Sequence, residues 1–339
     1  MGVSSSQEVG ESEKVPICYS PHYNISFMGI EKLHPFDSQK YRRVMEFLVS
    51  RDILKQCQVH SPERVKESVL HSFHTAQYME SLKKSSEVAQ IAEIPPLAIL
   101  PHFIVNSRVL TPMQYATGGT LEAAVLAQKH SWAINLGGGF HHACSHEGGG
   151  FCVYADISLA ILTLNEKYPK LQRFLIVDLD AHQGNGHEND KLSGKFKSLH
   201  VAIFDMYNHE IYPQDQRAKS AIDIKVQLPS NTGDKRYLSL LESNLAKAFK
   251  KYDPQFVLYN AGTDCLAGDP LGNLNVSEKG IVSRDQMVFQ AARDANVPVL
   301  MLLSGGYQKS NAVVIADSIQ NLDKQFSLLR SKAGSGKSN

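Results

Sequence analysis

Short, uninterrupted apolar runs recur along the chain, and they constrain its fold more than any other feature of the sequence. The clearest runs cover residues 15–19, 133–136, 174–179, 201–204, 256–259 and 297–303. A strand with one exposed face alternates apolar and polar residues, whereas a strand buried on both faces is apolar throughout. The runs therefore predict a parallel sheet that is covered on both sides.

Helical patterns lie between these runs. Residues 234–252 place apolar side chains on one helical face: Tyr237, Leu241, Leu245, Ala248, Phe249 and Tyr252. Ser61 followed by Pro62 has the pattern of a capped helix start, which predicts a helix running past Tyr78. The alternation of strand and helix predicts an α/β fold: one open, mostly parallel sheet flanked by helices on both faces. In such folds the active site lies at the carboxyl ends of the strands.

Residues 15–330 are expected to form one domain, because no linker or repeat interrupts them. Residues 1–14 and 331–339 lack apolar periodicity and are expected to be disordered. A net charge of +1 argues against direct nucleic-acid binding. The apolar runs end well short of the roughly 20 residues that cross a bilayer, so no transmembrane segment is expected.

The first residues offer one modification signal. Gly2, followed by Val3 and Ser6, fits the permissive myristoylation pattern. No basic patch follows to supply a second anchoring signal, so a polar leader without lipid is the favoured interpretation.

The run at residues 174–186 carries the most chemical information. Its apolar strand ends in Asp178, Asp180 and His182, followed by glycines. Taken singly, Asp180 could cap a helix and His182 could lie in a surface loop. Their common position at a strand end instead suggests a site at the carboxyl edge of the sheet.

A second apolar strand, at 256–259, is followed by Asp264. Buried carboxylates are costly unless they are paired or bind a cation, so convergence of Asp180 and Asp264 predicts a metal. Two carboxylates with the His182 imidazole leave a position for water, as in catalytic zinc sites. The same ligands would also accept Fe²⁺.

Two further strand ends carry reactive side chains. His141 and His142 follow a glycine-rich turn and suggest a general base with an electrostatic or acid partner. Phe151 follows a second glycine run, which allows a close backbone approach beside an aromatic ring. Tyr307 follows the last predicted strand and offers a phenol that could stabilise an oxyanion.

Together these motifs resemble the zinc-dependent histone deacetylases of the arginase/deacetylase superfamily, and most of all class IV, the histone deacetylase 11 type. The resemblance rests on residues 19–24, 33–37, 73–78, 117–120 and 305–307, besides the runs above. It implies an enzyme that removes acetyl or long fatty acyl groups from protein lysines, histones among them. It also implies a role in chromatin and transcription regulation with corepressor-type partners, and a location in the nucleus, the cytoplasm or both.

The resemblance implies a role for each residue of the predicted site. Zinc would bind the two aspartates and the histidine named above, His142 would be the base, and His141 would assist it. Asp178 would be the partner of His141. Asn185 would be the partner of His142, although many relatives have an aspartate there, which suggests a weaker base. Tyr307 would donate to the oxyanion.

The resemblance further implies a narrow tunnel and a second cation. Phe151 and Tyr212 would form its walls, Leu271 would lie near its floor or rim, and the Gly150 carbonyl would accept the substrate N–H. A structural K⁺ would bind near Asp178 and Asp205, with the Asp180 and His182 backbone.

Three other functions compete with this one. An arginase-like enzyme would use two metals, but Gly184 stands where the second metal needs an acid. Deacetylation of a small polyamine would use the same catalytic residues, but favours an acidic pocket mouth that the sequence does not show. A silent binding module in chromatin complexes would have lost Tyr307 or a metal ligand, and all of these are present.

Overall fold

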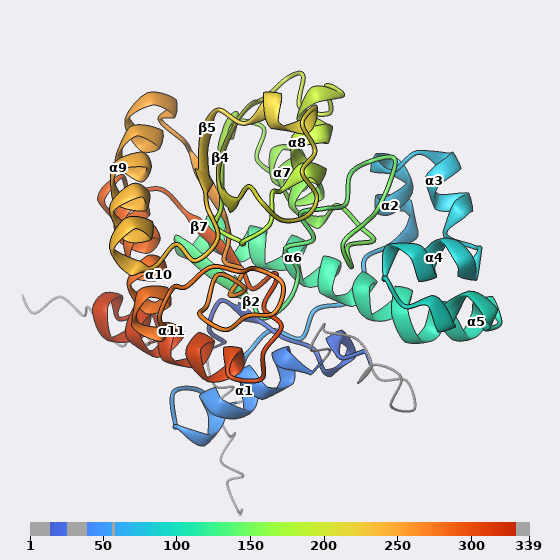
Figure 1. Ribbon diagram of the computed structural model, residues 1–339, viewed down its shortest axis with the longest axis horizontal. Coiled ribbons are helices and arrows are strands. Elements are labelled where there is room, and N and C mark those ends of the chain that lie inside the picture. The colour runs from blue at the N-terminus through green and yellow to red at the C-terminus, as the bar shows by residue number, and fades with distance from the viewer. Residues whose placement is uncertain (1–13, 26–38, 56–57, 330–339) are drawn as a thin grey trace, which may run out of the picture.

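The computed structural model describes residues 14–25, 39–55 and 58–329, and a parallel sheet with helices on both faces dominates it (Figure 1). The sheet has seven strands in the order β1-β2-β7-β6-β3-β4-β5. The predicted α/β class is confirmed. The strands are β1 Ile17–Cys18, β2 Trp132–Asn135, β3 Arg173–Asp178, β4 His200–Asn208, β5 Ile224–Leu228, β6 Phe256–Asn260 and β7 Val299–Leu302. The predicted ends, the Gly2 signal and the motif at 33–37 lie outside the described residues, apart from the exposed Lys14.

Every predicted apolar run contains a strand, but the sequence pattern missed β5. In this strand Val226 and Leu228 are buried, whereas Lys225 and Gln227 are exposed. The strand lies at the edge of the sheet, and among the described strands it pairs only with β4. Its alternating pattern reflects this position, because one of its faces meets solvent.

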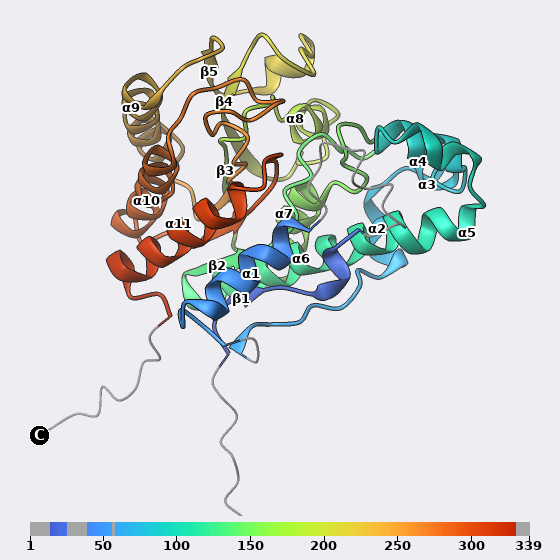
Figure 2. The ribbon, with the colours of Figure 1, turned by 60° about the horizontal axis from the view of Figure 1, so that its bottom comes forward.

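The helices pack in two layers, one on each face of the sheet (Figures 1 and 2). Helices α6 and α7 cover one face, while α1, α9, α10 and α11 cover the other. The α-helices are α1 Lys40–Ser50, α2 Glu67–Phe73, α3 Ala76–Ser81, α4 Ser85–Ile91, α5 His102–Val105, α6 Thr111–His130, α7 Asp156–Lys167, α8 Asn185–Leu192, α9 Asp234–Tyr252, α10 Glu278–Asp294 and α11 Asn311–Phe326. The prediction of a helix at 234–252 is confirmed by α9.

The prediction of one helix from Ser61 past Tyr78 is wrong. Residues 61–66 are not helical, and two short helices follow, the first of which begins at Glu67. At Val65 the backbone N–H donates to the Gln114 carbonyl of α6, so this segment pairs with a neighbour instead of coiling. Thr75 then starts a new helix, because its side chain accepts a hydrogen bond from the Tyr78 N–H.

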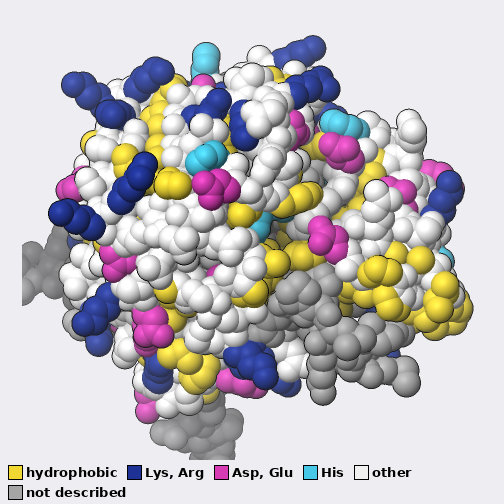
Figure 3. Space-filling view, viewed as in Figure 1, with side chains coloured by type: hydrophobic (Ala, Val, Ile, Leu, Met, Phe, Trp, Pro, Cys, Tyr) yellow, Lys and Arg dark blue, Asp and Glu magenta, His cyan; other side chains and the backbone are white. Residues whose placement is uncertain are grey.

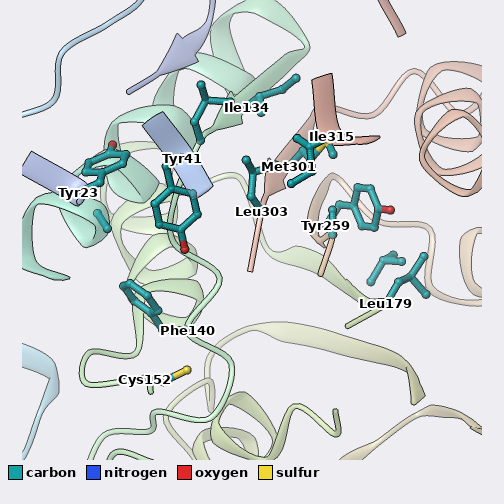
Figure 4. Close-up of a cluster of buried hydrophobic side chains, with 14 of the residues drawn as sticks. Tyr23, Tyr41, Ile134, Phe140, Cys152, Leu179, Tyr259, Met301, Leu303 and Ile315 are labelled. Atoms are coloured by element: carbon teal, nitrogen blue, oxygen red, sulfur yellow. The ribbon is translucent and has the colours of Figure 1, made fainter. Parts of the chain in front are cut away.

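Alternate residues of the central strands belong to two separate hydrophobic layers. In β3, Leu175 and Val177 face the layer that includes α9, α10 and α11, whereas Phe174 and Ile176 face the layer with α6 and α7. Figure 4 shows part of the first layer around Met301. Because both faces are buried, both sets of positions are apolar, which explains the uninterrupted runs.

The carboxyl ends of four neighbouring strands lie at one level of the sheet. Asp178 at the end of β3 pairs with Asn260 of β6, Asn260 pairs with Leu302 of β7, and Leu302 pairs with Asn135 of β2. The loops after these strands carry the predicted site residues. The sheet thus brings together segments that lie far apart in the sequence.

The face of the molecule seen in Figure 3 carries side chains of both charges. Figure 3 shows acidic and basic side chains interspersed on one face, with apolar side chains gathered over α4 and α5. Ile99 and Phe103 are the most exposed of these large apolar side chains. No helix in the described ranges has both the length and the apolar character that crossing a membrane requires.

Candidate active site

The loops after β3 and β6 bring the three predicted metal ligands together. Candidate ligand atoms of Asp180, His182 and Asp264 all lie within 4.8 Å of one another, and all three residues are buried. Nδ1 of His182 lies 2.9 Å from Asp264 Oδ2 and 3.1 Å from Asp180 Oδ1. The structure therefore assembles the predicted ligand set.

Backbone donors fix the orientation of both carboxylates. The Ala181 N–H donates to Asp264 Oδ1 over 2.8 Å, and the Gly305 N–H donates to Asp180 Oδ2 over 3.0 Å. The Ser304 hydroxyl also donates to Asp180 Oδ2. These bonds come from two different loops, so the site is held from both sides.

The electrostatics of this cluster fit a bound cation. Burial and the negative charge of Asp180 raise the pKa of Asp264 to about 7. Burial lowers the pKa of His182, but hydrogen bonds to Asp180 and Asp264 outweigh it and raise that pKa to about 10. Both pKa values are raised because the negative charge of the two buried carboxylates is not fully balanced by nearby positive charge. The oxygen and nitrogen donors thus fit a divalent ion such as zinc or Fe²⁺.

His141 lies beside the metal-ligand cluster with an acidic partner. Its Nδ1 is 2.9 Å from Asp178 Oδ2, as the sequence predicted. Burial lowers the pKa of His141, but the carboxylates of Asp178 and Asp180 outweigh it and raise the pKa to about 9. His141 is therefore positively charged at neutral pH.

His142 has the opposite environment, although it is the next residue. Its Nδ1 is 2.7 Å from Asn185 Oδ1, the neighbour that the resemblance implied. Burial, followed by the positive charges of His141 and His182, holds the pKa of His142 well below its usual value. His142 is therefore neutral near pH 7 and able to accept a proton.

The loop that carries both histidines is held by Asp156, which the sequence analysis missed. The N–H groups of Gly139 and Phe140 donate to its two carboxylate oxygens over 2.9 and 2.8 Å. Thr120 of α6 donates its hydroxyl to the same side chain over 2.6 Å. An aspartate in the first turn of a helix is ordinary, so nothing in the pattern distinguished this one.

A small cavity of about 20 Å³ opens beside the cluster. Its lining includes the predicted residues His141, His142, Gly150, Phe151, Asp180 and Tyr307. At Gly150, where φ is +49°, a Cβ atom would lie 2.4 Å from the His142 ring, so glycine is required there. The room within the described residues suits one water molecule or a group of similar size.

Three of the site residues predicted from the sequence lie at different depths. Tyr212 is 47% exposed and its ring centroid is 5.0 Å from that of His142, which places it at the mouth. Tyr307 lies deeper, with its ring centroid 6.2 Å from that of His182, and burial raises its pKa well above the usual value. Leu271 is half-buried in the Asp269 loop and does not line the cavity.

Lys40 is a second residue that the sequence analysis missed. This fully buried lysine of α1 donates from Nζ to the carbonyls of Ser304 and Gly305 over 2.5 and 2.8 Å. Burial lowers its pKa to about 8. Lys40 thereby anchors the loop that leads to Tyr307. Lysines at the start of a helix are usually exposed, so the sequence gives no signal for it.

Comparisons with known proteins agree with this geometry. Residues 34–322 match the family model of the histone deacetylase domain. The chain is 51% identical over 312 residues to histone deacetylase 2 of Arabidopsis thaliana, covering 92% of this chain and 79% of that protein. It is 31% identical over 270 residues to histone deacetylase 8 of Xenopus tropicalis, covering 76% of this chain and 71% of that protein. The crystal structure of the HDA15 HD domain shares the fold, with a TM-score of 0.71 at 22% identity over 94% of this chain and 89% of that one.

Proposed function

The chain belongs to the histone deacetylase family, and from this premise we propose that its site hydrolyses acyl-lysine with the help of one zinc ion. The homologues support a deacetylase enzyme that acts on acetylated lysine. One observation carries the finer proposal: Asp180, which belongs to the metal-ligand cluster, lines the same cavity as His141 and His142.

Zinc would be held by Asp180, His182 and Asp264, whose donor atoms and charge fit it. When bound, zinc polarises the amide carbonyl and a water molecule. Fe²⁺ would fit the same donors. A single ion is favoured because Gly184 offers no side-chain ligand for a second one.

His142 would act as the general base. Its Nδ1 donates to the Asn185 amide oxygen, which leaves the lone pair on Nε2 of this cavity-lining residue available. Because the pKa of His142 lies well below its usual value, the ring is ready to accept a proton from water near pH 7.

His141 and Tyr307 would stabilise the developing negative charge. His141 stays protonated beside Asp178 and supplies a fixed positive charge next to the reacting carbonyl. Tyr307 keeps its proton because burial raises its pKa, so its hydroxyl is a hydrogen-bond donor for the oxyanion.

The acyl-lysine would enter past Tyr212 and Phe151, with the Gly150 carbonyl as acceptor for the substrate N–H. The relatives named histone deacetylases support acetyl as the preferred group. A long fatty acyl chain, which class IV resemblance also implies, is the alternative that the kinetic test below decides.

A potassium ion would fit beneath the zinc site. Oδ1 of Asp205 and Oε1 of Gln183 are buried without a hydrogen-bond partner in the described part of the chain. Burial, then the negative charges of Asp178 and Glu188, raises the pKa of Asp205 well above its usual value. A monovalent cation between Asp178 and Asp205 would relieve this repulsion.

Histones are proposed among the substrates, because the relatives above are named histone deacetylases. Action in the nucleus, the cytoplasm or both, with corepressor-type partners, is proposed from the resemblance of the sequence motifs. Class IV membership is likewise proposed from the sequence motifs.

The test is a parallel kinetic assay of acetyl-lysine and myristoyl-lysine histone peptides and of an acetylated polyamine, with metal content measured for each preparation. We expect one zinc per chain, turnover of the acetyl peptide, and loss of that turnover in His142→Ala. Unchanged turnover by this variant would refute the mechanism. Faster turnover of the myristoyl peptide would refute the acyl preference, and preference for the polyamine would refute the protein substrate. No activity on any of them would favour a binding module.

A further inference from the structure

A second group of metal-binding side chains lies on the bend that follows the catalytic histidines. Cys144, His146 and Glu147 offer one thiol, one imidazole and one carboxylate, and their ligand atoms lie within 4.8 Å of one another. We propose that these three side chains bind a second, exchangeable divalent cation of the thiol-seeking class, such as zinc or cadmium.

The spacing of the three side chains resembles a tetrahedral site. His146 Nε2 lies 3.7 Å from Cys144 Sγ and 3.8 Å from Glu147 Oε1. In tetrahedral zinc sites, bonds of about 2.0 to 2.3 Å place neighbouring ligand atoms about 3.3 to 3.6 Å apart. Small side-chain adjustments are therefore enough to close the site around an ion.

The backbone of this bend is already held in place. The Cys144 N–H donates to the Glu147 carbonyl over 2.9 Å, and the Thr75 N–H donates to the Ser145 carbonyl over 2.8 Å. The Ser145 N–H donates to buried Asp190 over 2.8 Å. The ligands thus come from a preorganised segment, which lowers the ordering cost of binding.

The ligand types select the ion. Thiolate and imidazole favour zinc, cadmium and similar metals, whereas magnesium and calcium prefer sites built from oxygen alone. The buried cluster of Asp180, His182 and Asp264 contains no sulfur, so the two sites differ in chemistry.

The exposure of the ligands determines how the ion would behave. Cys144 is buried, but the side chains of His146 and Glu147 are 48% and 58% exposed. An ion held there would keep water on its open side and exchange with solvent. We therefore expect weaker binding than at the enclosed cluster, and no need for the second ion in the basal reaction.

A simpler interpretation is that Cys144 only packs as a small apolar side chain beneath a surface histidine. The two interpretations differ in one measurable property. Only a metal site gives a thiolate-to-metal absorption band, and only there does the metal affinity depend on His146 as well as on Cys144.

The experiment is a cadmium titration of the zinc-loaded enzyme, followed by ultraviolet absorption. We expect one equivalent to produce a cadmium–thiolate band, which Cys144→Ser abolishes. His146→Ala should weaken cadmium binding by at least about tenfold, because even the loss of a residue that hydrogen-bonds to a metal ligand lowers metal affinity by about that factor. His71→Ala, which changes another exposed histidine, should leave the titration unchanged.

Two further measurements keep the result clear. Competition by added zinc should suppress the cadmium band, and melting curves should show that every variant is folded. Absence of the band in the unmodified protein would overturn the proposal. So would a band of equal affinity in His146→Ala, since that would show a thiol acting without its neighbours.

Discussion

At the scale of single residues, the site depends on two adjacent histidines with opposite charge states. His141 lies near Asp178 and Asp180 and is held protonated, whereas His142 lies against the neutral amide of Asn185 and is held neutral. The same side-chain type therefore serves two purposes, and the partner decides which. When the environments of two titratable groups shift their pKa values in opposite directions, one group can act as an acid and the other as a base.

Replacing Asn185 with Asp should make His142 a stronger base. A carboxylate 2.7 Å from Nδ1 would favour the imidazolium and raise the pKa of His142 by about one unit or more. The base must be deprotonated, so activity falls as pH drops through this pKa. The acid limb of kcat/KM should therefore move to higher pH, with faster turnover above it. The pH profile of both enzymes measures this shift, and an unmoved acid limb would contradict the role given to His142.

Replacing Lys40 with Met should reduce catalysis by misplacing the Tyr307 loop. The change leaves the carbonyls of Ser304 and Gly305 without their donor. A small displacement of this loop is expected to lower kcat on the order of 10- to 100-fold. Steady-state kinetics at matched metal content measure the loss, and Lys40→Arg should restore part of it. Full activity in Lys40→Met would show that the loop needs no such anchor.

At the scale of elements, α6 lies close to the N-terminal segments because it lacks side chains at two positions. A Cβ atom at Gly118 would lie 2.1 Å from the Glu63 carbonyl oxygen, and one at Gly119 would lie 1.8 Å from the Tyr23 hydroxyl. The motif at 117–120 therefore has a packing role. Its last residue, Thr120, also supports Asp156 and so links α6 to the histidine loop.

Replacing Gly119 with Ala should destabilise the fold. The new methyl group would collide with the buried Tyr23 ring, and such overpacking costs about 1 to 3 kcal/mol. Gly233→Ala is a matched control, because its nearest contact would be 3.3 Å away. Urea unfolding of the two variants measures the difference. Equal stability of both would mean that Tyr23 moves aside without cost.

The elements also show what sequence alone could predict. Buried strands and α9 were predictable because burial imposes a pattern on consecutive residues. The edge strand β5 and the break at Thr75 were not, because they depend on what lies beside them. The site followed the same rule: Asp180, His182 and Asp264 come directly after predicted strands. Lys40, by contrast, contacts residues more than 260 positions away, and no local pattern records that.

At the scale of the whole molecule, the active site joins segments that the sheet brings together from distant parts of the sequence. Asp180 and Asp264 follow β3 and β6, which are neighbours in the sheet but more than 80 residues apart in the sequence. Buried Arg284 of α10 supports this junction, because it donates to the carbonyls of Ala261 and Gly262 just before Asp264. An ion at the site would therefore cross-link distant parts of the fold.

Removal of the metal should lower the unfolding temperature of the whole domain, and more so at high pH. A ligand present at about 1,000 times its Kd stabilises the folded state by about 4 kcal/mol. Without metal, the pKa of Asp264 is raised to about 7, so the folded state retains a proton that the unfolded state loses near pH 4. That stabilisation is lost as pH rises through 7, so the free energy of unfolding of the metal-free protein falls.

Melting curves with and without a chelator, at about pH 5 and about pH 8, test this expectation. The difference between the two forms should be larger at the higher pH, and added zinc should restore the original curve. Asp264→Asn is the matched control: it removes the carboxylate, so both the effect of the chelator and its pH dependence should shrink. A domain that melts at the same temperature with and without chelator would show that the cluster binds no ion tightly enough to join β3 and β6.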